Sequence, residues 1–215
     1  AYDLNNHRQI MLAMTMYAGD NNDFMPQPGW PMTVNHWASA ATGLYPLGGI
    51  PATQGTYDTK FPQQEQLFRN GQLGSYIKNV QSLRCPADNK MDTKFLQRGI
   101  YITSYSWNLA ANYWGSSTRT RKLSQFKADA ILQWEIDEAQ PTYFNDFANF
   151  PDEGVSSRHG NGATIACFGG SAERMSTKNF YALSGGRVVN LTDGGKSWKK
   201  LPVASLPNRI WCAPT

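Results

Sequence analysis

The first regular pattern of hydrophobic and polar positions lies in residues 4–22. Apolar side chains recur there three or four positions apart with polar residues between them, which is the spacing of one face of an amphipathic helix. Gly19 and the Asp and Asn residues after it tolerate the backbone conformations that end a helix. We therefore predict a helix over residues 4–22. Its packing face is predicted to consist of Leu4, Ile10, Met11, Met14 and Tyr17.

Residues 23–100 show no comparable pattern. Proline and glycine are frequent in the first half of this section, and proline interrupts both helices and sheet ladders. We expect a loop-rich insertion with one short helix near residues 35–42 and a second over residues 65–77. Residues 80–85 end at Pro86, whose ring disfavours helix at the residue before it.

Short runs of β-branched and aromatic residues, bounded by turn residues, dominate residues 101–200 and are predicted strands. Because they are not separated by helices, they favour an antiparallel sheet and the α+β class. The predicted strands cover residues 101–108, 130–136, 163–168 and 187–191.

The whole chain of 215 residues is long enough to bury the core of one domain. We treat residues 1–215 as a single domain with the helix in residues 1–22, the insertion in 23–100 and the sheet in 101–200. Residues 201–215 contain three prolines and are expected to form an irregular tail, anchored by Ile210 and Trp211.

The amount and distribution of charge and of apolar residues indicate whether the chain binds nucleic acid or spans a membrane. Charged residues make up 17% of the chain, and the net charge of +4 comes from scattered Lys and Arg. A nucleic-acid-binding protein usually carries a denser basic stripe, so we expect no nucleic-acid partner. No stretch approaches the roughly 18–20 consecutive apolar residues that a membrane-spanning helix needs.

Cys85, Cys167 and Cys212 are too few for a disulfide framework and lack the spacing of a zinc site. Two arrangements stay open. The three cysteines form one disulfide and leave one free thiol, or all three are free thiols. Only Arg84, beside Cys85, offers a cationic setting, so a reactive thiol is not expected. The cysteines therefore leave the cellular compartment undecided.

Five landmarks occur in the order found in pilin-like proteins with a prepilin-type cleavage and methylation segment. They resemble the exit of that family's N-terminal helix, two short loop motifs, a hydrophobic strand ending in Asp, and part of a C-terminal His-x9-Asp-Gly motif. They are NNHRQIMLA at residues 5–13 continuing to Pro26, RCPAD at 84–88, SYSWN at 104–108, AILQWEID at 130–137 and RHGNGA at 158–163.

The resemblance implies the head of a type II secretion pseudopilin or a type IV pilin-like subunit, with a pilin-like fold of one helix packed on a small sheet. It implies an assembly protein without enzyme activity, catalytic residue or cofactor. Its partners would be other pseudopilin subunits, secretion-system components and secreted cargo. The head would lie in the periplasm or outside the cell, anchored in the inner membrane by a segment ahead of residue 1.

One departure from the family motif concerns His159. Nine residues after it the family has Asp-Gly, whereas this chain reads Gly169-Gly170. We interpret His159 and Asp137 as structural residues, with the carboxylate of Asp137 accepting hydrogen bonds from the His159 loop. A calcium site that includes Asp137 stays open, because calcium prefers several oxygen ligands; no metal ligand is otherwise assigned.

Two other functions stay open. Aromatic residues in the predicted loops, among them Trp30, Trp37 and Trp114, could form a binding surface for carbohydrate or protein, or could equally form a small core beneath the loops. A metal-assisted hydrolase centred on His159 is the second alternative, since histidine is a common ligand and general base.

Overall fold

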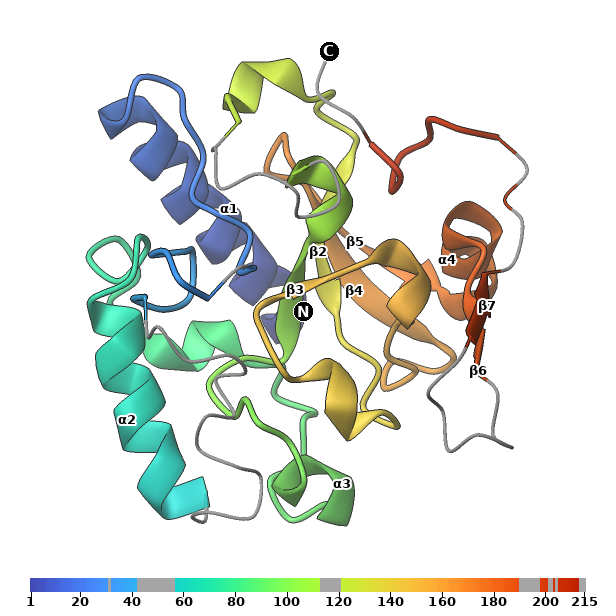
Figure 1. The fold of residues 1–215 in the computed structure, drawn as a ribbon, viewed down its shortest axis with the longest axis horizontal. Helices are drawn as coiled ribbons and strands as arrows, with labels where there is room; N and C mark the ends of the chain where they lie inside the picture. Colours follow the sequence, from blue (N-terminus) through green and yellow to red (C-terminus); the bar gives the residue numbers. More distant parts are fainter. Residues whose placement is uncertain are drawn as a thin grey trace.

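The computed structural model describes residues 1–30, 32–41, 57–112, 121–189, 198–200, 203 and 205–212. A long N-terminal helix, α1 (Tyr2–Asp20), lies beside a five-stranded sheet, and further helices and loops surround them (Figure 1). The predicted α+β class is confirmed. Within the described residues, no helix is both long enough and apolar enough to cross a membrane.

Helix α1 packs against the sheet with the face that its sequence predicts. Ile10, Met11 and Met14 are fully buried and join the main core cluster, while Leu4 and Tyr17 are half-buried at its margin. The backbone N–H of Asp23, just after the helix, donates to the carbonyl of Ala18. The helix therefore starts at residue 2 and ends at residue 20, two residues earlier at each end than the predicted range of 4–22.

The sheet has the strand order β3-β1-β2-β4-β5. Its inner pairs β1–β2, β2–β4 and β4–β5 are antiparallel, whereas β3 pairs with β1 in parallel. The prediction of an antiparallel sheet is therefore wrong at one edge, because the chain returns to β1 through a long connection rather than a hairpin. The strands are β1 (Tyr105–Asn108), β2 (Ile131–Glu135), β3 (Ala148–Asn149), β4 (Gly162–Cys167) and β5 (Ala172–Ser176).

Both faces of the sheet are covered. One face carries Leu132 and Ala166 against α1, and the other carries Trp134 and Ile165 against α4 (Thr177–Ser184) and the C-terminal segment. In Figure 1, α1 and α4 flank the strands on opposite sides. Because the strands are buried on both faces, their sequences do not alternate strictly between apolar and polar residues, and the polar residues that they do carry, such as Gln133 and Glu135, are buried.

The insertion contains more helix than its composition predicts. Helix α2 (Tyr57–Arg69) begins before residue 65 and includes Pro62, so the predicted range of 65–77 is wrong. Its inward face carries Lys60, Gln64 and Phe68, and the Gln64 side chain binds the backbone of residues 99, 101 and 102. A buried face that is mostly polar gives no hydrophobic period to detect.

The rest of the insertion is turns and short helices. Residues 35–41 form turns rather than the predicted helix, and residue 42 lies outside the described residues. The short helical segments of the described chain are η2 (Val80–Leu83), α3 (Thr93–Leu96), η3 (Leu109–Asn112), η4 (Leu123–Gln125), η5 (Pro141–Tyr143) and η6 (Pro151–Glu153).

The C-terminal part adds two elements that the sequence did not predict, β5 and α4. Ser176 caps α4 by accepting a hydrogen bond from the Asn179 backbone, and Gly185 ends it in a left-handed conformation (φ 78°) that suits glycine. Strand β6 (Arg187–Val189) confirms part of the predicted strand at 187–191 and pairs with β7 (Trp198–Lys200).

The predicted tail anchors are confirmed, because Ile210 and Trp211 are buried in the second core cluster.

We expect the two faces of α1 to differ sharply in their contribution to stability. Met14→Ala should lower the free energy of unfolding by about 2–5 kcal/mol, because it leaves a cavity in the main core. Leu12→Ala is the matched control: the Leu12 side chain is 61% exposed, so its loss should stay within about 0.5 kcal/mol. Urea unfolding followed by circular dichroism measures both, and equal losses would contradict the docking of α1.

Candidate functional site

Four potential metal ligands converge where α1 meets the sheet: Asp3, Cys85, Glu135 and His159. One ligand atom of each lies within 4.8 Å of the ligand atoms of the others. The His159 Nε2 atom is 3.3 Å from an oxygen of Asp3, 3.3 Å from an oxygen of Glu135 and 3.4 Å from the sulfur of Cys85. We call these four residues the acid–histidine cluster.

Asp3 reaches the cluster from the first turn of α1. Its side chain is 6% exposed, and its two carboxylate oxygens accept short hydrogen bonds from the hydroxyls of Tyr105 in β1 and Thr164 in β4. The Asn6 amide, one turn later, donates to the carbonyl of Arg84. Polar contacts therefore attach the start of the helix, whereas apolar contacts hold its second half.

A chain of hydrogen bonds beneath α1 fixes the protonation of His7. The Gln133 amide accepts from the Trp107 indole, so its nitrogen faces His7 and donates to Nδ1. The Nε2–H of His7 then donates to the Thr164 hydroxyl, which donates to Asp3. Burial lowers the pKa of His7 to about 4, so this ring is neutral.

Glu135 is the most deeply buried carboxylate of the cluster. It ends β2, is fully shielded from solvent, and accepts the Thr164 backbone N–H at 2.8 Å. Arg158 pairs with its other oxygen at 3.3 Å. Burial alone would raise the pKa of Glu135, but the hydrogen bond from His159 and the charge of Arg158 lower it to about 2.

A second buried carboxylate extends the charge pattern away from α1. Asp88 pairs with Arg158 at 3.2 Å and with Arg98 at 2.7 Å, and all three side chains are almost inaccessible. The Ser104 hydroxyl also donates to Asp88. The order Arg98, Asp88, Arg158, Glu135, His159, Asp3 therefore alternates in charge when His159 is protonated; we call these six residues the ionic chain.

His159 is the most accessible member of the cluster, with a side chain 26% exposed. It begins the tight turn that leads into β4: its backbone N–H donates to Gly162, and Asn161 takes φ 57°. The hydrogen bond to Glu135 raises the pKa of His159 above its usual value, opposed by partial burial and supported by the charge of Asp3. The ring is the most exposed side chain of the cluster, with Asp3 at 6% the next.

Cys85 supplies the sulfur of the cluster. Burial and the neighbouring carboxylates of Glu135 and Asp3 raise the pKa of the thiol far above its usual value, so it carries its proton. The Ala87 backbone N–H lies 3.4 Å from the sulfur. Cys167 and Cys212 are also buried and free, so the three cysteines form no disulfide.

The prediction that Asp137 binds the His159 loop differs from the hydrogen bonds of the structure. The Asp137 carboxylate accepts from the Ala139 backbone, whereas the loop donates to Glu135 through Arg158 and to Glu138 through Ser157. The interpretation of Asp137 is wrong because β2 ends at Glu135, which turns that residue and not Asp137 toward α1.

Gly169 and Gly170 form the turn between β4 and β5, where Gly170 has φ 87° and a Cβ at Gly169 would meet the backbone oxygen of Ala128 at 2.9 Å. The six residues of β4 separate this turn from His159, roughly 20 Å at 3.3 Å per residue. An Asp at this turn would therefore lie far from His159 and could not share a ligand with it.

The predicted ligand-contact aromatics divide three ways. Trp37 is fully buried, stacks on Trp107 with ring centres 5.0 Å apart and donates its indole N–H to Phe147, so it belongs to the core beneath the loops. Trp30 is half-buried and lines a cavity of about 250 Å³. Trp114 lies outside the described residues.

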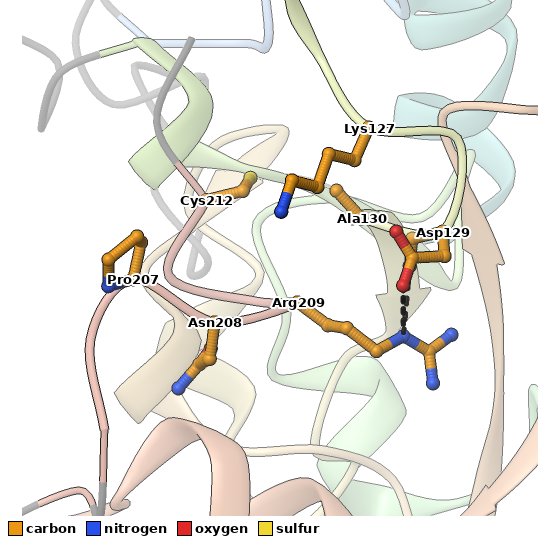
Figure 2. Close-up of a pocket in the computed structure, with 7 residues that line it drawn as sticks. All are labelled: Lys127, Asp129, Ala130, Pro207, Asn208, Arg209 and Cys212. Atoms are coloured by element: carbon orange, nitrogen blue, oxygen red, sulfur yellow. Dashed lines mark hydrogen bonds and ion pairs between the residues drawn. The ribbon is translucent and has the colours of Figure 1, made fainter. Parts of the chain in front are cut away.

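A separate pocket, also of about 250 Å³, lies between the loop before β2 and the C-terminal tail (Figure 2). Arg209 turns its guanidinium toward Asp129 and also pairs with Glu173 at 2.7 Å. Cys212, at the pocket wall, has its pKa raised by burial to about 12. These groups hold the tail against the sheet, and the pocket shares no residue with the acid–histidine cluster.

The sequence of α1 contains one signal for the cluster. Asp3 and His7 stand four positions apart and continue the buried stripe of α1 toward its start. Two polar residues in register with an apolar face indicate a buried polar contact. The remaining members, at positions 85, 135 and 159, have no mutual spacing that a sequence motif could reveal.

Glu135→Gln should lower the free energy of unfolding by about 3–5 kcal/mol, because it removes one of the two buried carboxylates that pair with Arg158 and leaves Arg158 to share Asp88 with Arg98. Glu173→Gln is the matched control. The Glu173 side chain is 48% exposed, so its ion pair with Arg209 should contribute less than about 1 kcal/mol. Urea unfolding at neutral pH compares them. Equal losses would show that the ionic chain is not a major source of stability.

Asp146, which lines the Trp30 cavity, should make stability depend on pH. Burial and then the nearby Glu153 raise its pKa to about 8, although the Ala148 N–H opposes this. Because the unfolded carboxyl ionises near its ordinary value, the contribution of Asp146 to stability is greatest below about pH 4 and is lost as the pH rises from about 4 to about 8.

Asp146→Asn removes the ionisation and keeps the acceptor for Ala148. It should therefore be more stable than the wild type at pH 8.5 by several kcal/mol, at about 1.4 kcal/mol per pKa unit, and near-equal to it at pH 4. Thermal unfolding of both proteins across this range measures the difference. A constant difference between them at all pH values would contradict the raised pKa.

Comparison of the chain with protein-family models, with curated proteins and with solved structures found no match.

Proposed function

We propose that this chain is the head of a pilin-like subunit, of the type II secretion pseudopilin or type IV pilin class, that acts through assembly and protein interaction. The proposal joins the ordered sequence landmarks with the way α1 is presented. The head would stand in the periplasm or outside the cell, and an apolar segment ahead of Ala1 would continue α1 into the inner membrane.

The observation that carries the proposal is the outward face of α1. Tyr2, Leu12 and Met16 are 82%, 61% and 50% exposed. Together with the exposed Asn5 and Gln9, they form a mostly apolar and amide-bearing stripe along the helix, with the exposed charges of Arg8 beside it and Asp20 at its C-terminal end. The solvent face of a surface helix usually carries more charge than this, so a partly apolar stripe flanked by only two charges is suited to packing against another helix.

The inward face explains how such a helix can serve as a spine. The polar contacts of Asp3 and His7 and the apolar contacts of Ile10 and Met14 fix α1 on the sheet along its length. Because α1 is fixed to the head, a neighbouring helix that packs against α1 also determines where the head lies. In this proposal the exposed stripe contacts other subunits, while the surface loops contact cargo or secretion components.

The two alternatives have less support. The binding module depended on loop aromatics, and Trp37 is part of the core. The hydrolase alternative depends on His159. The imidazole of His159 contacts Glu135 and Asp3, and His159 lines neither of the two pockets of about 250 Å³ described above.

We expect the double substitution Leu12→Glu with Met16→Glu to abolish subunit association in the full-length protein. Charges on the stripe would have to be desolvated when helices pack, which is costly. Photo-crosslinking from a residue introduced at position 9, in the native membrane, should give a ladder of cross-linked subunits in the wild type and only monomer in the variant.

Met91→Glu is the matched control, because Met91 is 83% exposed but lies outside α1. It should leave the ladder unchanged. Circular dichroism of the head must remain as in the wild type for both variants. A ladder that survives the α1 double substitution, or a wild type that gives no ladder, would contradict the assembly proposal.

A further inference from the structure

We propose that the acid–histidine cluster of Asp3, Cys85, Glu135 and His159 binds one divalent transition-metal ion of the Zn²⁺ type. The inference comes from the geometry and chemistry of these four residues and does not depend on the assembly proposal. It assigns to the cluster a structural role, in which the ion links the first turn of α1 to three separate segments of the head.

The distances suit tetrahedral coordination. Zn²⁺ bonds of about 2.0–2.3 Å to N, O and S ligands place neighbouring ligand atoms roughly 3.3–3.8 Å apart. The Nε2 of His159 is already 3.3, 3.3 and 3.4 Å from the other three ligand atoms. All four lie within 4.8 Å of one another, so small side-chain adjustments complete the site.

Hydrogen bonding alone does not account for this convergence. The Nε2 atom of His159 carries at most one proton, yet it faces the oxygens of Asp3 and Glu135 and the sulfur of Cys85 at nearly equal distances. One N–H can serve one of these acceptors well. A cation at the centre serves all four groups at once, which gives an independent reason to expect an ion.

The groups behind the ligands are those that metal sites require. The Tyr105 hydroxyl holds the second oxygen of Asp3, and Arg158 holds the second oxygen of Glu135. The Ala87 backbone N–H points at the Cys85 sulfur. Such outer contacts orient the ligands and are part of the affinity of natural sites.

The ligand types select the metal. Calcium takes six to eight oxygen ligands, whereas this set offers one nitrogen, one sulfur and two carboxylates. Imidazole and thiolate favour zinc and its neighbours. Four protein ligands fill a tetrahedron and leave no open position for substrate, which is the pattern of a structural rather than a catalytic ion.

Binding is balanced in charge. The ion displaces the Cys85 thiol proton, and any proton on His159, into solvent. The resulting thiolate and the carboxylates of Asp3 and Glu135 carry three negative charges, matched by the divalent ion and Arg158. The partly exposed His159 ring provides the side from which the ion and the protons exchange with solvent.

The test is a titration of the EDTA-treated protein with Co²⁺, which reports coordination in its absorption spectrum. We expect saturation at one equivalent, with the visible bands of tetrahedral Co²⁺ and a near-ultraviolet thiolate-to-cobalt band. Zn²⁺ should displace the Co²⁺ and raise the thermal midpoint of the wild type, because an ion that binds only the folded state stabilises it.

Cys85→Ser should abolish the thiolate band and weaken Zn²⁺ binding by at least ~10–100-fold, the range that follows loss of even an outer-shell partner. Cys167→Ser is the matched control, since Cys167 is equally buried but outside the cluster. His159→Gln gives a second test if Cys85→Ser does not fold. A wild type without a tetrahedral spectrum at one equivalent, or unchanged binding by a folded Cys85→Ser or His159→Gln variant, overturns the proposal.

Discussion

The ionic chain is the constraint on which the rest of the structure depends. A buried carboxylate without a cation is so unfavourable that it would be protonated or the site would open. Asp88 and Glu135 are both buried, and Arg158 lies between them as the shared partner. The RCPAD segment, the end of β2 and the turn before β4 therefore have to come together for any one of them to be satisfied.

Asp3 extends this requirement to α1 and sets the register of the helix on the sheet. Along β4, the polar Thr164 faces the start of α1, while the apolar Ala166 faces its later turns. A shift of α1 by one turn, about 5.4 Å, would move Asp3 off its hydroxyl donors and His7 off Gln133. The apolar stripe alone would tolerate such a shift much better, because hydrophobic contact is not directional.

The sequence predicted those parts of the fold in which burial is periodic. The α1 stripe and three strands of the sheet follow from apolar spacing, and so does the α+β class. Helix α2 was mislocated because its inward face uses Lys60 and Gln64, and β3 was missed because two residues carry no period. The cluster is harder still, because its members are brought together by the sheet order and not by proximity in the chain.

The position of the cluster connects its chemistry to the helix. Asp3 belongs to α1, whereas Cys85, Glu135 and His159 belong to the head, so a cation held among them, whether imidazolium or metal, attracts the helix to the head. Removing positive charge at this point would leave two carboxylates facing each other with Arg158 beside only one of them. The docking of α1 is therefore governed at its polar end by charge, which changes with protonation or metal binding, and at its apolar end by hydrophobic packing, which does not depend directly on either.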